Sequence, residues 1–224
     1  MKHPQQSWSL VIEGPFHGEF NMALDEAYLD FVSAPLLRIY QFLEPMLSIG
    51  YFQKWKEVSP DTKFVRRYTG GGAVQHGKDC VYALVIPKDH FFCKVAATDT
   101  YFSIHKAIGV GISKLGLETT LYGGEKKQEG AFCFQKPVKH DLMWGQEKIA
   151  GAAQRRNRKG LLHQGSVQLP KGIFFDEMRR AIVRGFEETF GVYFQQDEIS
   201  ESVWSLAKEL ELKKYKTEAW NYMR

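Results

Sequence analysis

The sequence predicts an α+β fold, in which a mixed β-sheet packs against helices. Short strand patterns dominate the middle of the chain, and helical patterns are inserted between and after them. This order favours a mixed layer fold over a doubly wound parallel sheet. The chain has 224 residues, of which 44% are hydrophobic, so it can bury a core without a metal or a disulfide. We therefore expect a single domain over residues 1–224.

The first half of the chain begins with a helix that we expect over residues 21–32. Asn21 is a favourable N-cap for it, and its apolar residues fall on one face. Strands follow, and their expected ranges are 36–42, 46–51, 64–68 and 81–86. The last of these is almost entirely apolar, which is typical of a buried strand.

The second half contains the clearest helix, over residues 98–115. Apolar residues recur along one stripe of it, and Gly116 stands where a C-cap is expected. Strands are expected next at residues 140–144, 147–152 and 165–169. Two further helices close the chain. One has an apolar residue at every fourth position from Met178 to Phe190, and the other lies near residues 203–210.

The composition excludes several function classes. The net charge is +4, from 30 basic and 26 acidic residues, which is too small an excess to indicate nucleic-acid binding. Three cysteines without close pairing argue against a disulfide framework and for a reducing compartment, and none has zinc-type spacing. No stretch approaches the roughly 20 apolar residues of a membrane span. A signal peptide is also missing, so we expect a soluble cytoplasmic protein.

The segment 66–76 is the first that could carry chemistry, and it reads RRYTGGGAVQH. Three consecutive glycines disfavour a strand or helix, but they allow positive φ and a close approach of the backbone to a ligand. The preceding Arg66 and Arg67 are suited to a phosphate or carboxylate. A plain glycine turn is the alternative. The segment is not a phosphate loop of the Walker type, because no Gly-Lys-Ser/Thr follows.

Two later segments could share the same site. Residues 147–156 read EKIAGAAQRR, so small side chains follow Lys148 and leave room for a ligand beside its positive charge. For a lone lysine a surface position is more common. Residues 161–167 read LLHQGSV, and here His163 is as compatible with a hydrogen-bonded core residue as with a catalyst.

Cys133 is the candidate nucleophile. It precedes Pro137 in a lysine-rich stretch, where positive charge would raise the thiolate fraction. The alternative is an inert cysteine between two phenylalanines, and the residues alone do not decide between the two. Cys80 and Cys93 flank an apolar strand and are expected to be structural.

Together these segments resemble the family of lipoate-protein ligases and octanoyltransferases, which shares its fold with biotin-protein ligases. The resemblance covers nearly the whole chain. Its motifs are NMALDEA at 21–27, SIGYFQ at 48–53, the loop at 66–76, KIAGAAQ at 148–154, HQGS at 163–166 and WNY at 220–222. Cys133-Phe134, followed by Pro137 and then by Lys148, further resembles the cysteine-type octanoyltransferases of Gram-positive bacteria.

The resemblance implies a function. Octanoyl would move from octanoyl-acyl carrier protein through a Cys133 thioester to the acceptor lysine of a lipoyl domain, such as glycine cleavage H protein or a 2-oxoacid dehydrogenase E2. Cys133 and Lys148 would be catalytic, and no metal or other cofactor is implied. The implied substrate-binding residues are Arg66, Arg67, Thr69, Gly70, Gly71, Gly72, His76, Gly151, Ala152, His163 and Gly165.

Alternatives remain. The triple glycine is more typical of ATP-dependent ligases, which form lipoyl-AMP and need ATP and magnesium. We expect no small C-terminal accessory domain of the kind that single-chain ligases carry, which favours a transferase or a ligase split over two polypeptides. A non-catalytic lipoyl-domain binder is a third possibility. The choice between octanoyl and lipoyl stays open. Six basic residues are expected to form a docking surface for acidic carrier domains, namely Lys126, Lys127, Arg155, Arg156, Arg158 and Lys159.

Overall fold

The computed structural model describes residues 6–59, 61–124 and 137–224. In these ranges one sheet has eight strands and a second has three. In spatial order, the large sheet contains β11 (Tyr193–Gln196), β1 (Ser7–Ile12), β2 (Leu36–Tyr40), β6 (Asp79–Pro87), β10 (Gly160–Gln168), β9 (Glu147–Asn157), β8 (Leu142–Trp144) and β7 (Thr119–Leu121). The small sheet contains β4 (Phe64–Arg66), β3 (Met46–Ile49) and β5 (Val74–His76).

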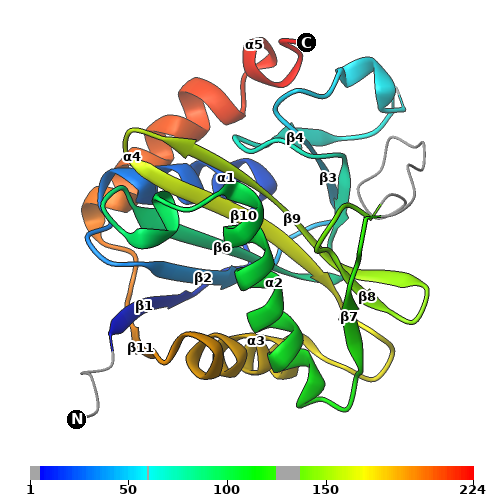
Figure 1. Cartoon of the computed structure of the whole chain (residues 1–224). Coiled ribbons are helices and arrows are strands. Elements are labelled where there is room, and N and C mark those ends of the chain that lie inside the picture. Colours follow the sequence, from blue (N-terminus) through cyan, green and yellow to red (C-terminus); the bar gives the residue numbers. More distant parts are fainter. Residues whose placement is uncertain (1–5, 60, 125–136) are drawn as a thin grey trace.

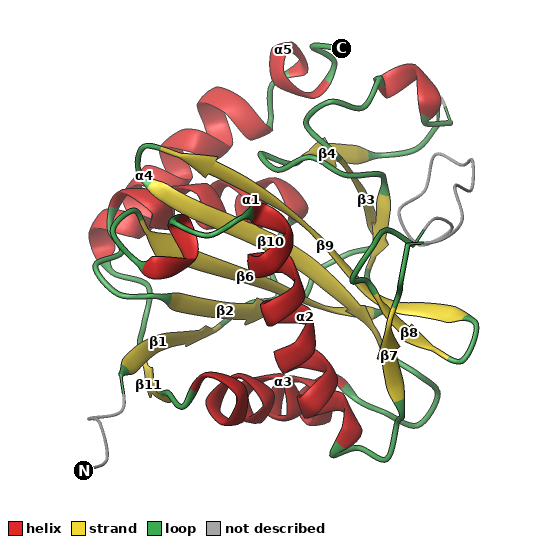
Figure 2. Cartoon of the chain, in the orientation of Figure 1, coloured by secondary structure: helices red, strands yellow, loops and turns green. Residues whose placement is uncertain are grey.

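The large sheet is mixed. Strand β1 runs parallel to both of its neighbours, whereas the pairs from β2 across to β7 are antiparallel. Helices lie on both faces, as Figures 1 and 2 show. They are α1 (Gly18–Ala27), α2 (Ala97–Ser113), α3 (Phe175–Phe190), α4 (Glu201–Leu210) and the short α5 (Glu218–Asn221). The expected α+β fold with a mixed sheet is confirmed. Among the described residues, no helix is long and apolar enough to cross a membrane.

The two faces of the sheet carry separate cores. Helices α2 and α3 cover one face, and α1 and α4 cover the other. Because side chains alternate along a strand, neighbouring residues of β10 serve opposite faces. Leu161 and Val167 belong to the core under α2 and α3, whereas Leu162 belongs to the core under α1. This alternation decides which of the sequence motifs reach a common site.

The start of the first helix differs from the expectation. Helix α1 begins at Gly18, and Asn21 lies fully buried inside it rather than at its N-cap. The Asn21 amide donates to the carbonyls of Phe16 and Gln41, and its Oδ1 accepts from Arg38. Asparagine satisfies buried carbonyls as well as helix ends, so the residue type alone does not separate the two roles. The short strands β1, β5, β7 and β11 were also missed by the sequence patterns.

Two buried histidines lie beneath α2. The rings of His105 and His163 have centroids 6.0 Å apart, and both residues are fully buried. Burial lowers the pKa of His105 to about 4 and the pKa of His163 well below its ordinary value. Their Nε2 and Nδ1 atoms, respectively, lack a hydrogen-bond partner among the described residues. Both histidines are therefore neutral in the folded protein at neutral pH.

We predict that acid destabilises the fold through these histidines. Between the unfolded pKa of about 6.5 and the lower folded value, the unfolded chain binds more protons than the folded one, so the free energy of unfolding falls as pH falls. In this pH range, each histidine should lower the free energy of unfolding by about 1.4 kcal/mol for each pH unit of acidification. The free energy of unfolding, measured by urea denaturation between pH 7 and 4.5, should depend less steeply on pH in His105→Asn than in the wild type. The control is His17→Asn, since His17 is largely exposed. Parallel slopes in the wild type and His105→Asn would contradict this prediction.

Candidate functional site

A narrow cleft opens between the large sheet, the small sheet and α1. Its floor comes from adjacent segments of β9 and β10, namely Gly151, Ala152, Ala153, Gln164, Gly165 and Ser166. The facing wall comes from the small sheet and the glycine loop, with Ser48, Arg67, Gly71, Val74 and His76. Met22, Tyr40 and Val81 complete it. A larger but shallower hollow lies beside β1, and it contains none of the expected site residues.

Lys148 lies beside the floor of this cleft. A register shift in the pairing of β8 with β9 lies next to it, because Leu142 pairs with Ala150 whereas Met143 pairs with Lys148. The Lys148 side chain folds over Gly151, where a Cβ atom would overlap with Lys148 Cε and Nζ. The glycine of the KIAG motif is thus required by the lysine that precedes it. Lys148 is almost completely buried.

Asp141 is the counter-ion of Lys148, and the sequence motifs did not identify it. Its Oδ2 lies 2.7 Å from Lys148 Nζ and also accepts from the Val138 N–H at 2.7 Å. Its Oδ1 accepts from the Tyr101 hydroxyl. A buried amine requires a nearby carboxylate, because isolated buried charge is costly. Asp141, which precedes an apolar strand, is the acid that this rule would have suggested.

Arg67 fixes the shape of the glycine loop. Its guanidinium donates to the carbonyl of Ser48 on one side and to the carbonyls of Gly70 and Gly72 on the other. Gly71 has φ of +87°, a conformation that favours glycine, and it packs against Ala153 on the floor of the cleft. The loop therefore closes over β9, and Arg67 holds it there.

Arg66 was expected to bind substrate, and the structure places it behind the wall of the cleft. Its side chain is fully buried and donates to the carbonyls of Gly50, Tyr51 and Gln53 and of Trp220 and Asn221. The Asn221 side chain accepts from the Arg66 N–H in return. The guanidinium thus fastens the C-terminal segment to the small sheet. Its donors bond to backbone carbonyls, and Arg66 is not among the residues that line the cleft.

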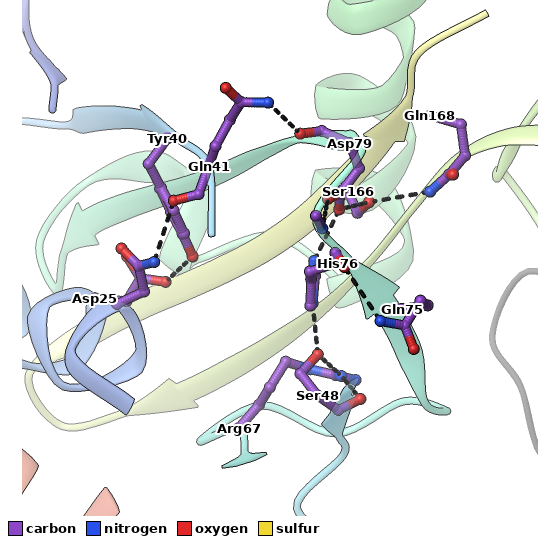
Figure 3. A network of polar contacts seen from close by, with 12 residues as sticks. Asp25, Tyr40, Gln41, Ser48, Arg67, Gln75, His76, Asp79, Ser166 and Gln168 are labelled. Atoms are coloured by element: carbon purple, nitrogen blue, oxygen red, sulfur yellow. Dashed lines mark hydrogen bonds and ion pairs between the residues drawn. The ribbon is translucent and has the colours of Figure 1, made fainter. Parts of the chain in front are cut away.

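His76 faces the cleft in a polar network (Figure 3). Its Nδ1 lies 2.8 Å from Asp79 Oδ2, and its Nε2 lies 2.7 Å from Ser48 Oγ. Burial alone would raise the pKa of Asp79. The charge of His76 and the hydrogen bonds from His76 and Ser166 outweigh burial, so the pKa of Asp79 is lowered. Ser-His-Asp hydrolases use the same residue types. Here Ser48 Oγ also accepts from Arg67 and is buried, so the network orients His76 rather than presenting a serine nucleophile.

A second network connects the floor of the cleft to α1. The Thr69 hydroxyl donates to Gln164 Oε1 at 2.8 Å, and Gln164 Nε2 donates to Asp25 Oδ2 at 2.7 Å. Asp25 also forms a buried ion pair with Arg38 and accepts from Tyr40. Thr69 therefore supports the cleft through Gln164. Asp25, the first acid of the first-helix motif, thus serves this network and is not in the lining of the cleft.

His163 was also expected to bind substrate, and the structure places it outside the lining of the cleft. It lies on the face of β10 that α2 covers, fully buried beside Tyr82 and Tyr101. The neighbouring Gln164 and Ser166 point into the cleft instead. A one-residue step along a strand reverses the face, and the motif HQGS gave no indication of which residues face inward. Gly165 lines the cleft with its backbone, and a Cβ there would overlap with the Tyr82 ring.

The three cysteines differ. Cys133 lies outside the described residues. Cys80 is fully buried, and burial raises its pKa well above the ordinary value; the pKa of Cys93 is raised for the same reason. Neither is a reactive thiolate. Within the described ranges, no group of three His, Cys, Asp or Glu side chains could hold a metal ion.

Of the basic residues expected to form one docking surface, Arg155 and Arg156 lie on opposite faces of the sheet. Arg158 and Lys159 line the hollow beside β1, and Lys126 and Lys127 lie outside the described residues. Arg155 stands on the same face of β9 as Gly151 and Ala153, and its guanidinium packs against the rings of Tyr51 and Tyr68. Arg156 points to the other face and donates to Val95 and Thr100 near the start of α2. The structure thus separates Arg155, beside the cleft, from Arg156.

Comparisons with known proteins agree on one family. The model of the lipoyl protein ligase A/B catalytic domain matches residues 17–218. The octanoyltransferase LipM of Staphylococcus epidermidis is 29% identical, over 97% of this chain and 99% of the relative. A structure of lipoate-protein ligase A bound with ATP superposes with a TM-score of 0.82 at 28% identity, covering 97% of this chain and 99% of that one. A bipartite lipoate protein ligase from Thermoplasma acidophilum, studied with its E2 lipoyl domain, superposes with a TM-score of 0.79 at 26% sequence identity. The match covers 97% of this chain and 96% of that one.

We predict that Gly151→Ala displaces the Lys148 side chain. The added methyl would overlap with Lys148 Cε and Nζ, so the amine must leave Asp141 or the strand must shift. Overpacking of this kind costs about 1–3 kcal/mol of stability. Acetylation of Lys148 by acetic anhydride, followed by peptide mass spectrometry, should become several-fold faster. Gly123→Ala is the control, because a Cβ at Gly123 meets nothing within 4 Å. Equal labelling in both variants would refute the displacement.

Proposed function

The chain belongs to the lipoyl protein ligase A/B catalytic domain family, whose model covers residues 17–218, and we propose that within this family it is an octanoyltransferase. It moves octanoyl from octanoyl-acyl carrier protein to the acceptor lysine of a lipoyl domain. The relatives named octanoyltransferase LipM, which match the chain over nearly its full length, support this choice.

The observation that carries the proposal is the position of the Lys148 amine at the side of a narrow cleft floored by glycine and alanine. In the proposal an eight-carbon chain lies along this cleft, and burying six or seven methylenes at about 0.8 kcal/mol each gives roughly 5 kcal/mol of binding. The cleft residues Gly151, Ala152, Gly71 and His76 surround this chain in the proposal, and Arg67 with Thr69, Gly70 and Gly72 shapes the wall around it.

The reaction proceeds in two acyl transfers. The Cys133 thiolate attacks the thioester carbonyl, and the carrier sulfur leaves as a thiolate, which places octanoyl on Cys133. The acceptor lysine, as a neutral amine, then attacks this thioester; an amide forms, and the Cys133 sulfur departs with the proton of the amine. Lys148 donates a hydrogen bond to the carbonyl oxygen while negative charge develops there. One such donor typically contributes about 3 kcal/mol in a site that excludes water.

The covalent structure of the chain supports a role for Cys133. Val138 donates its N–H to Asp141 Oδ2, the atom that also binds Lys148. Val138 comes five positions after Cys133, so an extended chain between them spans at most about 18 Å. On the other side of the segment, Tyr122 bonds with the backbone of Asp141 and His140. Both flanks of the cysteine segment are thus attached beside the lysine.

Carrier domains dock, in this proposal, at the side of the cleft marked by Arg155. The rings of Tyr51 and Phe52 stand next to it, and Arg224 lies over both rings. Phe52 is 70% exposed. A cationic and aromatic rim of this kind suits an acidic protein surface, because complementary charge accelerates association.

A lipoate-protein ligase is the second candidate. The ATP-bound relative and the triple glycine favour it. Such a ligase would form lipoyl-AMP with ATP and would need Lys148 but not Cys133. Dependence on ATP and independence of Cys133 therefore distinguish the ligase from the transferase in an experiment.

We predict that the intact enzyme gains the mass of one octanoyl group when incubated with octanoyl-acyl carrier protein. The adduct should vanish in Cys133→Ser and persist in the control Cys93→Ser, because Cys93 is half-buried with a raised pKa. Intact-mass spectrometry measures this directly. The ligase would instead show lipoate-dependent pyrophosphate exchange with ATP that survives Cys133→Ser, and that result would replace the transferase.

We also predict that Arg155→Glu slows association with an acidic lipoyl domain about 5- to 10-fold at low salt. The salt dependence of the rate should flatten, since screening acts on the charge that has been removed. Stopped-flow measurements at several ionic strengths test this. Arg158→Glu is the matched control, because this exposed residue lies beside the separate hollow near β1. Equal rates for the two variants would remove Arg155 from the docking surface.

A further inference from the structure

The edge of β9 is closed by a side chain. Strand β8 pairs with β9 only as far as Ala150, so beyond that point the outer edge of β9 has no strand partner among the described residues. The hydroxyl of Tyr101, from α2, occupies this position. It accepts from the Ala152 N–H at 3.0 Å and lies 3.2 Å from the Ala152 carbonyl oxygen. Ala152 itself lines the cleft.

The same hydroxyl binds the counter-ion of Lys148. Tyr101 donates to Asp141 Oδ1, while Asp141 Oδ2 is 2.7 Å from Lys148 Nζ. Burial, followed by the charge of Asp141, raises the pKa of Tyr101 well above its ordinary value, so the hydroxyl remains a donor. A single oxygen thus connects the floor of the cleft to the carboxylate that holds the amine.

Helix α2 also fixes the backbone around Asp141. One turn after Tyr101, His105 Nδ1 lies 2.7 Å from the carbonyl oxygen of His140, and the Phe102 ring contacts the His140 ring. His140 has φ of +74°, which is uncommon for any residue other than glycine. Such conformations persist only where surrounding contacts enforce them. The position of Asp141 is therefore imposed by α2.

We propose that Tyr101 is a positioning residue for acyl transfer, which acts through Asp141 to set the place of the Lys148 amine. This inference rests on the proposed function, in which that amine contacts the acyl carbonyl. Electrostatic stabilisation of a developing oxyanion depends on donors held at the correct distance before the reaction. Tyr101 touches neither the thioester nor the attacking amine, and its effect is exerted on geometry alone.

The test compares Tyr101→Phe with Tyr82→Phe. Tyr82 is another fully buried tyrosine in the same core, and its hydroxyl lies 3.3 Å from His163 instead of bonding to Asp141. Both variants should lower the melting temperature. Only Tyr101→Phe should lower kcat for octanoyl transfer, by about 10- to 100-fold, with KM for the donor unchanged within about twofold. Equal kcat values for both variants would overturn the proposal.

A double-mutant cycle separates positioning from general destabilisation. In a Lys148→Ala background, Tyr101→Phe should reduce the rate of acyl-enzyme formation by less than about twofold. If the two residues acted independently, Tyr101→Phe would instead reduce that rate by the same factor in both backgrounds. Acetylation of Lys148 supplies a readout that needs no activity: it should accelerate in Tyr101→Phe and stay unchanged in Tyr82→Phe. Unchanged labelling in Tyr101→Phe would overturn the proposal. Wild-type enzyme that never takes up octanoyl would instead refute the proposed function and leave the labelling result standing.

Discussion

The burial of the Lys148–Asp141 ion pair is the constraint on which the rest of the site depends. Removing two charges from water costs several kcal/mol for each ion, and the loss is offset only by close pairing and additional hydrogen bonds. The structure supplies these through Tyr101 and the Val138 N–H. Space for the lysine comes from Gly151, which lacks a Cβ. The identity of residue 151 and the placement of α2 both follow from one buried amine.

The alternation of strands β9 and β10 divides the functional cleft from the helix-covered core. Gln164 and Ser166 face the cleft, while His163 between them faces α2. On β9, Arg155 stands on the cleft side and Arg156 anchors the start of α2. A polar residue in these strands thus has one of two unrelated roles, and a single step in sequence changes it.

Buried arginines form the frame around the cleft. Arg38 pairs with Asp25 beneath the floor, Arg66 fastens the C-terminal segment, and Arg67 shapes the glycine loop. Each guanidinium presents several donors in a rigid plane, so it can satisfy several carbonyl or carboxylate oxygens at once. Arg66 and Arg67 both belong to the glycine-loop motif at 66–76, and their bonds to backbone carbonyls hold the wall of the cleft in place.

The sequence by itself determined the mixed α+β architecture, the long helices and the importance of the segments around Gly70 and Lys148. Periodicity and glycine content are local properties of the sequence, so they can be recognised without knowing how the chain packs. Only the tertiary structure identified Asp141 as the partner of Lys148 and Tyr101 as a donor to Asp141, and only it placed Arg66 and His163 outside the lining of the cleft. Those assignments depend on which face of a strand is covered and which carbonyls lie nearby, and both are set by contacts between residues far apart in the chain.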